Sequence, residues 1–219
     1  MKFKPPKDVN YCATIVEITN TIPLDNCDNV ISTIIFGFPV IVPKTTKVGD
    51  TGVYFPPEAQ LCDKYCSENN LYRYTDLNKD KTKTGYTEEN RRVRTVKFRG
   101  NQSAGLFMPL DSLAYFTKLD LEVGSVFDNI NGQEICRKYV TQQPQSQGTN
   151  LTKQQQKVKS RVLTNQFNFH VSTPNFGRNL HKIKEDDIIT ITKKLHGTSV
   201  VCSQVLCKKP LSIKDRIAK

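Results

Sequence analysis

The sequence predicts a mainly β chain with some α structure: a small N-terminal β-barrel, followed by the incomplete start of an α+β domain. Three observations support this prediction. Short runs of β-branched and aromatic residues, separated by Asn, Asp, Gly and Pro, fill residues 1–140. A Gln-rich stretch then interrupts this pattern. Further β-branched runs and a helix-like segment follow it.

The N-terminal part predicts strands at residues 11–18, 30–42, 51–55, 93–98 and 105–109. Strands this short, in a module of this size, are typical of a Greek-key barrel such as the OB-fold. A β-sandwich of similar size fits the same pattern. Between residues 63 and 90 the chain is polar, Lys-rich and poor in aliphatic side chains, so we expect a long surface loop there.

Residues 141–160 are Gln-rich and carry few large apolar side chains. Such a segment cannot bury enough surface to offset its ordering entropy, which predicts an interdomain linker. Residues 161–219 then begin a second domain, with strands expected at 187–192 and 199–206 and a helix opening at 210–218. If that domain is incomplete, we expect a partial sheet with exposed apolar side chains.

Basic residues outnumber acidic ones, with 32 Lys and Arg against 21 Asp and Glu and a net charge of +11. This excess would attract a polyanion, and nucleic acid is the first candidate. A merely solvated Lys-rich surface is the alternative. The chain has no run of about 18 apolar residues and no apolar signal core. We therefore expect a cytoplasmic protein, whether of a cell or of a virus-infected host.

The cysteines are odd in number, 7, and widely scattered. This distribution predicts reduced thiols instead of a secreted disulfide framework. Cys62 with Cys66, and Cys202 with Cys207, would each offer two thiolates to zinc. Neither spacing is a standard zinc knuckle, and no His is near either pair in the sequence, so no metal site is predicted.

Lys194-Leu195-His196-Gly197 lies between the two C-terminal β-branched runs. The lysine then falls at a strand end and the glycine in a tight turn. A lysine amine is a nucleophile only when neutral, so its ordinary pKa of about 10.4 must be lowered by burial or nearby cations. A nucleotide pocket, with Lys193 and Mg²⁺ nearby, would provide both. The chemistry indicated is in-line attack of the Lys194 amine on the α-phosphate of a nucleotide.

This Lys-x-His-Gly segment resembles motif I of the covalent nucleotidyltransferases, the superfamily of DNA ligases, RNA ligases and mRNA capping enzymes. The His form, followed by Thr and Ser, is more typical of ATP-dependent RNA ligases. The resemblance implies that Lys194 carries AMP and that His196 and Gly197 lie beside the ribose and α-phosphate. It also implies Thr192 and His181 as nucleotide-binding residues.

Five further segments are similar to parts of phage and bacterial RNA ligases that carry an N-terminal OB-like domain: residues 49–58, 91–100, 103–109, 173–182 and 186–192. The resemblance implies ATP and Mg²⁺ as cofactors, and RNA with 5′-phosphate and 3′-hydroxyl ends as the partner. The family's other motifs follow motif I, and none lies in the 22 residues after Gly197. We therefore expect a missing C-terminal segment or a second chain to complete the active site.

The basic run at residues 91–99 has its own physical interpretation. A period of two puts Arg92, Arg94 and Phe98 on one face, with Lys97 and Arg99 on the other. Cations on both faces are typical of an edge or barrel strand that binds phosphates. The basic residues Arg92, Arg94, Lys97 and Arg99 are therefore the predicted nucleic-acid-binding residues. Solvated cations around a buried Phe98 are the alternative.

Two functions from different classes remain open. One is an ATP-dependent RNA ligase that seals RNA ends through a lysyl-AMP intermediate. The other is a non-catalytic OB-fold module that binds nucleic acid and carries a vestigial nucleotidyltransferase segment. A capping-type guanylyltransferase is a third, disfavoured by the Lys-x-His-Gly form and by the leading OB-like domain. Only an enzyme requires Lys194, whereas binding by the module would depend on Arg92, Arg94 and Lys97.

Overall fold

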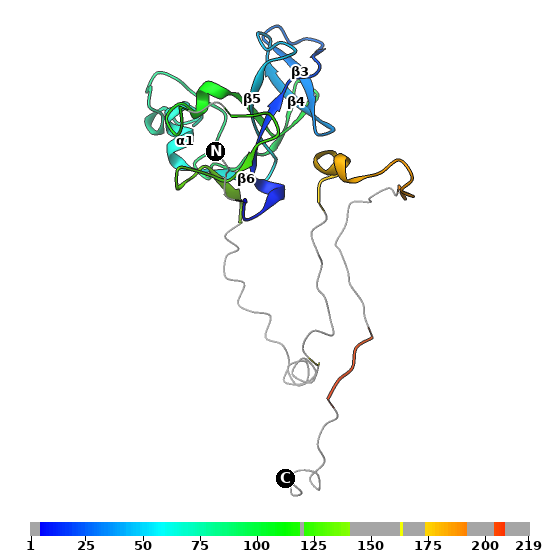
Figure 1. Cartoon of the computed structure of the whole chain (residues 1–219). Coiled ribbons are helices and arrows are strands. Elements are labelled where there is room, and N and C mark those ends of the chain that lie inside the picture. Colours follow the sequence, from blue (N-terminus) through cyan, green and yellow to red (C-terminus); the bar gives the residue numbers. More distant parts are fainter. Residues whose placement is uncertain (1–4, 119–120, 141–162, 164–173, 192–203, 209–219) are drawn as a thin grey trace, which may run out of the picture. The chain divides into compact units, whose positions relative to one another are not determined.

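The computed structural model describes residues 5–118, 121–140, 163, 174–191 and 204–208. The chain divides into two compact units. The first comprises Met1–Val140 with Pro174–Lys182, and the second comprises Thr141–Thr173 with Ile183–Lys219. The first unit is drawn from blue to green in Figure 1, with Pro174–Lys182 in orange. It contains all of the strands and helices named below.

Short strands make up most of this unit. They are β1 (Ala13–Glu17), β2 (Ile22–Pro23), β3 (Val30–Ile35), β4 (Phe38–Pro43), β5 (Thr51–Phe55), β6 (Ala59–Leu61), β7 (Thr95–Phe98), β8 (Asn101–Ala104), β9 (Leu106–Pro109), β10 (Val126–Phe127), β11 (Asn129–Ile130), β12 (Gln133–Glu134) and β13 (Cys136–Lys138). The helical elements are α1 (Asp63–Glu68) and the 3₁₀ turns η1 (Val9–Tyr11), η2 (Thr75–Leu77), η3 (Leu110–Leu113) and η4 (Gly177–Lys182).

The central sheet has the order β10-β1-β5-β9, and its pairs are antiparallel. Thr14 of β1 lies opposite Tyr54 of β5, which in turn lies opposite Phe107 of β9. Gly52 of β5 allows a close approach, since a Cβ there would lie 2.5 Å from the ring of Phe107. The middle strands are therefore tightly packed against β9.

The strands β2, β3 and β4 form a second sheet, in which β3 and β4 lie side by side (Figure 1). We expected one strand over residues 30–42, and that prediction was wrong. Phe36 and Gly37 both have positive φ, +51° and +82°, which turns the chain into a hairpin. The hairpin is connected to β8 by a 2.9 Å hydrogen bond from the Ile41 amide to the Ser103 hydroxyl.

Apolar side chains fill two clusters. The smaller cluster comprises Val16, Ile18, Ile35, Val40, Val42, Tyr54 and Phe107. The larger includes Ile15, Phe55, Leu61, Tyr65, Tyr72, Leu113 and Phe127. Residues 13–16 are buried without interruption, and so are residues 52–55, because each of these strands is covered on both faces. Burial of each large side chain stabilises the fold by about 1.5–3 kcal/mol.

The segment at residues 63–90 is not the surface loop that we expected. It begins with α1, whose Tyr65 and Cys66 are fully buried in the larger cluster. The Asn78 side chain is also buried, where it accepts from the Tyr72 amide at 2.9 Å and donates to the Tyr72 carbonyl at 2.8 Å. Side-chain amide bonds of this kind let a polar segment pack without regular strands.

The other strands predicted in the N-terminal part are present, with some differences at their ends. The strand predicted at 51–55 coincides with β5, and the one predicted at 105–109 begins one residue before β9. The strand predicted at 11–18 is β1, with η1 before it, and the one predicted at 93–98 begins later, at Thr95. The expected mainly β architecture is confirmed. Among the described residues, no helix is long and apolar enough to cross a membrane.

Described residues of the second unit carry no strand. The strand predicted at 187–192 is therefore wrong over 187–191, because no described residue pairs with this run. Ile188 and Ile191 are 98% and 89% exposed. Most of the strand predicted at 199–206, the linker at 141–160 and the helix at 210–218 lie outside the described residues.

Candidate nucleic-acid interface

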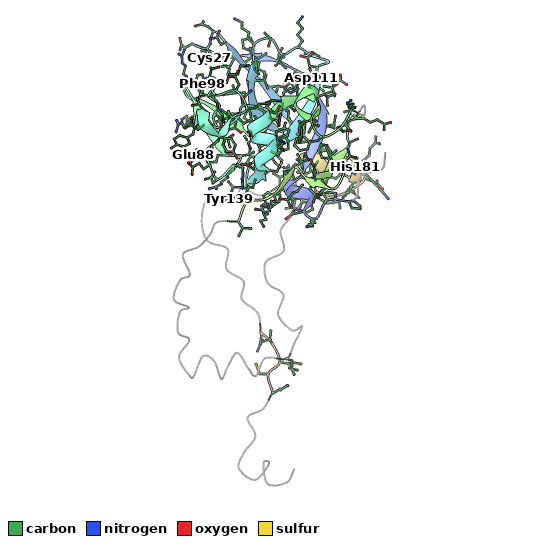
Figure 2. The ribbon with its side chains drawn as sticks, turned by 90° about the vertical axis from the view of Figure 1, so that its left-hand side faces the viewer. Cys27, Glu88, Phe98, Asp111, Tyr139 and His181 are labelled. Atoms are coloured by element: carbon green, nitrogen blue, oxygen red, sulfur yellow. The ribbon has the colours of Figure 1, made fainter. Side chains whose placement is uncertain are left out.

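A cleft of about 480 Å³ lies between the β7–β8 hairpin, the β3–β4 sheet and the chain around Tyr86. It is lined by Val30, Ile41, Arg73, Gly85, Tyr86, Arg94, Val96, Lys97, Phe98, Ser103, Gly105 and Leu106. These residues come from segments far apart in the sequence, so only the fold brings them together. Figure 2 labels Phe98 and Glu88, which lie on the same side of the unit.

Apolar and aromatic side chains provide much of the cleft surface. Val30, Ile41 and Leu106 are half-buried members of the lining. Phe98 is 45% exposed and Tyr86 is 39% exposed. Burial of the Tyr86 hydroxyl raises its pKa above the usual value. Exposed aromatic rings beside an apolar surface are what a flat, unsaturated ligand requires.

Three cations line the same cleft: Arg73, Arg94 and Lys97. Arg94 forms a 2.7 Å ion pair with Glu88, and both side chains are more than a third exposed. Such a surface pair is worth only about 0–1 kcal/mol, so a phosphate can replace the carboxylate. Neither Arg73 nor Lys97 has a carboxylate partner among the described residues. The cleft therefore carries uncompensated positive charge.

The strand β7 has an open edge. It pairs with β8 only, within the described part of the chain. A two-residue turn joins the strands, with φ of +46° at Arg99 and +89° at Gly100. Phe98 and Asn101 close this turn as a hydrogen-bonded pair, so the backbone groups of Lys97 point away from β8. Val96, Lys97 and Phe98, three consecutive residues of β7, line the cleft.

The structure separates the four predicted nucleic-acid-binding residues. Arg94 and Lys97 line the cleft, but Arg92 and Arg99 do not. Arg92 forms a 2.7 Å ion pair with Glu58, and its guanidinium lies 4.9 Å from the ring centre of Tyr139. Arg99 stands in the turn and donates to the Asn26 carbonyl oxygen.

The alternation of faces predicted for residues 91–99 also fails. Arg91 has a φ of +56°, and β7 begins only at Thr95, so the residues before it do not alternate. Val93 is fully buried. Arg91 is partly buried against Asp63, with a distance of 3.5 Å between Nη1 and Oδ1. Charge alone therefore did not identify which cations are free to bind a ligand.

Sequence analysis missed Arg73 and Tyr86 because both lie in the segment taken as a solvated loop. A signal was present, since Arg73 stands between Tyr72 and Tyr74, and a Lys-rich stretch precedes Tyr86. An interleaving of aromatic and basic residues is common where protein contacts single-stranded nucleic acid. Phe107 of β9 belongs to the smaller apolar cluster and does not line the cleft.

Lys194, His196, Gly197 and Thr192 lie outside the described residues. Of the predicted nucleotide-binding residues, only His181 is described. It is exposed on η4, and Figure 2 shows it on the opposite side of the first unit from Phe98. The structure therefore does not bring His181 to the basic cleft.

The segment that contains η4 packs against the barrel through Arg178. Its Nη1 donates to the Val9 carbonyl at 2.7 Å, and its Nη2 donates to the Cys12 carbonyl at 3.4 Å. The guanidinium lies 5.1 Å from the ring centre of Phe36 and 5.9 Å from that of Tyr54. These contacts hold Pro174–Lys182 on the unit even though many residues separate it from Val140.

In the described part of the chain, no group of three or more His, Cys, Asp or Glu side chains is arranged to hold a metal ion. Burial raises the pKa of the Cys66 and Cys136 thiols, which disfavours the thiolate that metal binding and disulfide exchange require. These residues do not provide the site that the predicted Mg²⁺ needs.

A family model described as an OB-fold domain matches residues 12–110. The matched region runs from just before β1 to just after β9 and contains every residue that lines the cleft. The N-terminal part is thus an OB-fold, as the strand pattern predicted. No curated protein matches the chain.

Solved structures similar to the chain include three variants of an RNA ligase from Naegleria gruberi, each with ATP and Mn. One has a TM-score of 0.47 and 22% identity, and the match covers 80% of this chain and 46% of that chain. A second has a TM-score of 0.40 and 22% identity, with coverages of 58% and 35%. The third has a TM-score of 0.37 and 27% identity, with coverages of 52% and 31%. The chain thus spans less than half the length of each of these ligase chains.

Proposed function

We propose that the OB-fold unit binds RNA and that the chain is part of an ATP-dependent RNA ligase whose nucleophile is Lys194. The cleft carries the first half of this proposal. It joins an apolar, aromatic surface to Arg73 and Lys97, two cations without carboxylate partners in the described structure. Unpaired cations beside aromatic rings match the phosphates and bases of a nucleic acid.

The second half rests on the Lys-x-His-Gly segment that contains Lys194. In the proposed reaction, the neutral Lys194 amine attacks the α-phosphate of ATP, a phosphoramidate bond forms and pyrophosphate leaves. The AMP then passes to a 5′-phosphate RNA end. A 3′-hydroxyl attacks that activated end, the phosphodiester forms and AMP is released. Mg²⁺ bound with the nucleotide would offset the charge of its phosphates.

The alternative is a non-catalytic OB-fold module that binds nucleic acid. It shares the cleft with the ligase but needs no reactive lysine. Arg73, Arg94 and Lys97 line the cleft, whereas Arg92 and Arg99 do not. Phosphate binding is therefore proposed for Arg73, Arg94 and Lys97, and the roles first predicted for Arg92 and Arg99 are not carried forward.

Adenylylation separates the two functions. The chain is incubated with Mg²⁺ and ATP labelled at the α-phosphate, beside the variants Lys194→Ala and Lys44→Ala. Lys44 is the control, because it is exposed and has no proposed role in the reaction. The ligase predicts a labelled adduct that Lys194→Ala abolishes and Lys44→Ala retains, with mass spectrometry placing AMP on Lys194. RNA binding without any adduct would instead favour the binding module.

RNA binding is tested by fluorescence anisotropy over a series of salt concentrations. Each phosphate contact on a single strand contributes roughly 0.7 to the slope of log K against log salt. We expect Arg73→Gln and Lys97→Gln to reduce the slope by about that amount each. Arg137→Gln is the control, because Arg137 is exposed but lies 3.6 Å from the Glu134 carboxylate and outside the cleft. Equal slopes for all three variants would exclude the cleft as the phosphate site.

A further inference from the structure

We infer that the cleft selects single-stranded RNA by taking one unstacked base against Phe98 and Tyr86, with the flanking phosphates on Arg73 and Lys97. This inference rests on the proposed RNA-binding function and specifies its substrate. A basic surface alone would bind any phosphate backbone. The aromatic and apolar part of the cleft also needs a flat apolar surface to pack against it. In RNA, only a base that is not stacked on its neighbours offers such a surface.

The cleft's size and lining support a base as the occupant. Its volume of about 480 Å³ falls within the range of roughly 300–1,000 Å³ found for small-ligand pockets. Val96 and Phe98, both on β7 two residues apart, project from the same face of the strand and are 37% and 45% exposed. Together with Val30, Ile41 and Leu106, they give the cleft an apolar surface that the face of a base can cover.

Backbone groups at the β7 edge supply the polar contacts that a base would need. The amide and carbonyl of Lys97 point away from β8, and no second strand pairs with them in the described structure. A nucleobase carries donors and acceptors on its edge and an apolar face. An open strand edge beside an aromatic ring offers partners for both.

Duplex RNA cannot use these groups. Its bases are stacked on one another, and their faces are covered on both sides. A duplex would meet only the cations at the rim, so its affinity should depend on salt but not on Phe98. A single strand or an unpaired end should depend on both. The cleft would thus favour ends that are free to pair or to be joined.

The experiment uses the full chain with a fluorescein-labelled 12-nucleotide RNA and the same sequence as a duplex. Phe98→Leu removes the ring but keeps an apolar side chain. Phe38→Leu is the matched control, because Phe38 is 41% exposed yet does not line the cleft. We expect Phe98→Leu to weaken single-strand binding roughly 5- to 100-fold and to leave duplex binding within about twofold. Phe38→Leu should change neither.

A second measurement needs no variant. RNA carrying 2-aminopurine at one position is added to the wild-type chain, and its fluorescence should fall when the base stacks on an aromatic ring. Equal binding of single strand and duplex, with no effect of Phe98→Leu and no quenching, would overturn the inference. If Arg73→Gln and Lys97→Gln still reduced the salt slope in that case, the proposed RNA binding would stand. If the wild-type chain bound neither the single strand nor the duplex, the proposed RNA-binding function itself would be contradicted.

Discussion

Gly177→Ala tests whether Pro174–Lys182 is held on the barrel by close backbone contact. A Cβ at Gly177 would lie 2.4 Å from the carbonyl oxygen of Phe36 and 2.7 Å from its carbonyl carbon. Both atoms belong to the backbone of the β3–β4 turn, so neither can rotate away as a side chain would. The segment must retreat by about 1 Å to restore ordinary van der Waals contact.

The size of the effect follows from two opposing contributions. Overpacking of this kind costs about 1–3 kcal/mol. Alanine also restricts the undocked chain, which favours the docked state by about 0.4–1 kcal/mol. The clash dominates, because the retreat also lengthens the 2.7 Å hydrogen bond from Arg178 to the Val9 carbonyl. We expect a net loss of about 1–2 kcal/mol, which raises the undocked fraction roughly 5- to 30-fold.

Trypsin provides the assay, because cleavage after Arg178 requires a side chain that is free of Phe36 and Val9. When opening is fast relative to cleavage, the rate follows the undocked population. Cleavage after Arg178 should become roughly 5- to 30-fold faster in Gly177→Ala. Leu180→Ala, at a position that is 54% exposed, is the control and should not change that rate. Equal rates in Gly177→Ala and the wild type would refute this reasoning.

Three further predictions follow from buried groups. Burial raises the pKa of Tyr54 from 10.0 to about 12, so the stability that its protonated phenol supplies is complete below pH 10 and is lost as the pH approaches 12. Urea unfolding of Tyr54→Phe should therefore show a shallower fall in stability between pH 10 and 12, and an unchanged slope would contradict this. Cys207 is exposed whereas Cys66 and Cys136 are buried, so iodoacetamide should alkylate Cys207 first, and mass spectrometry showing equal rates would count against the packing. Tyr65→Phe removes a 2.7 Å hydrogen bond to the buried Ser112 hydroxyl and should cost about 1–2 kcal/mol in unfolding free energy. Adding Ser112→Ala should cost little more, and fully additive losses would argue against the bond.

Several features of the fold could be predicted from the sequence because they depend on local pattern. β5 has a β-branched and aromatic composition between turn residues, and its limits were predicted as the structure has them. The hairpin at Phe36 and Gly37 was missed because its apolar run continues through the turn without a polar break. The segment at residues 63–90 was misjudged because side-chain hydrogen bonds, such as those of Asn78, hold it in place. Such bonds leave no periodic signal.

In the candidate site, too, some features could be predicted from local sequence and others depended on packing. Net positive charge and a basic run near Phe98 indicated nucleic acid without any structure. The run did not show which of its cations line the cleft, because the other walls of the cleft come from segments far from the run in the sequence. Arg73 and Tyr86 entered the site only through packing. Lys194 remains a prediction from its motif.

The sequence by itself determined the mainly β character of the N-terminal part, its excess of positive charge and the Lys-x-His-Gly segment, since each is a property of composition or of neighbouring residues. The tertiary structure decided which charges are compensated, where an apolar cleft opens beside them and that Pro174–Lys182 packs on the barrel. Those properties depend on distances between residues far apart in the chain. Coulomb and van der Waals energies depend on spatial separation, which only the folded chain sets.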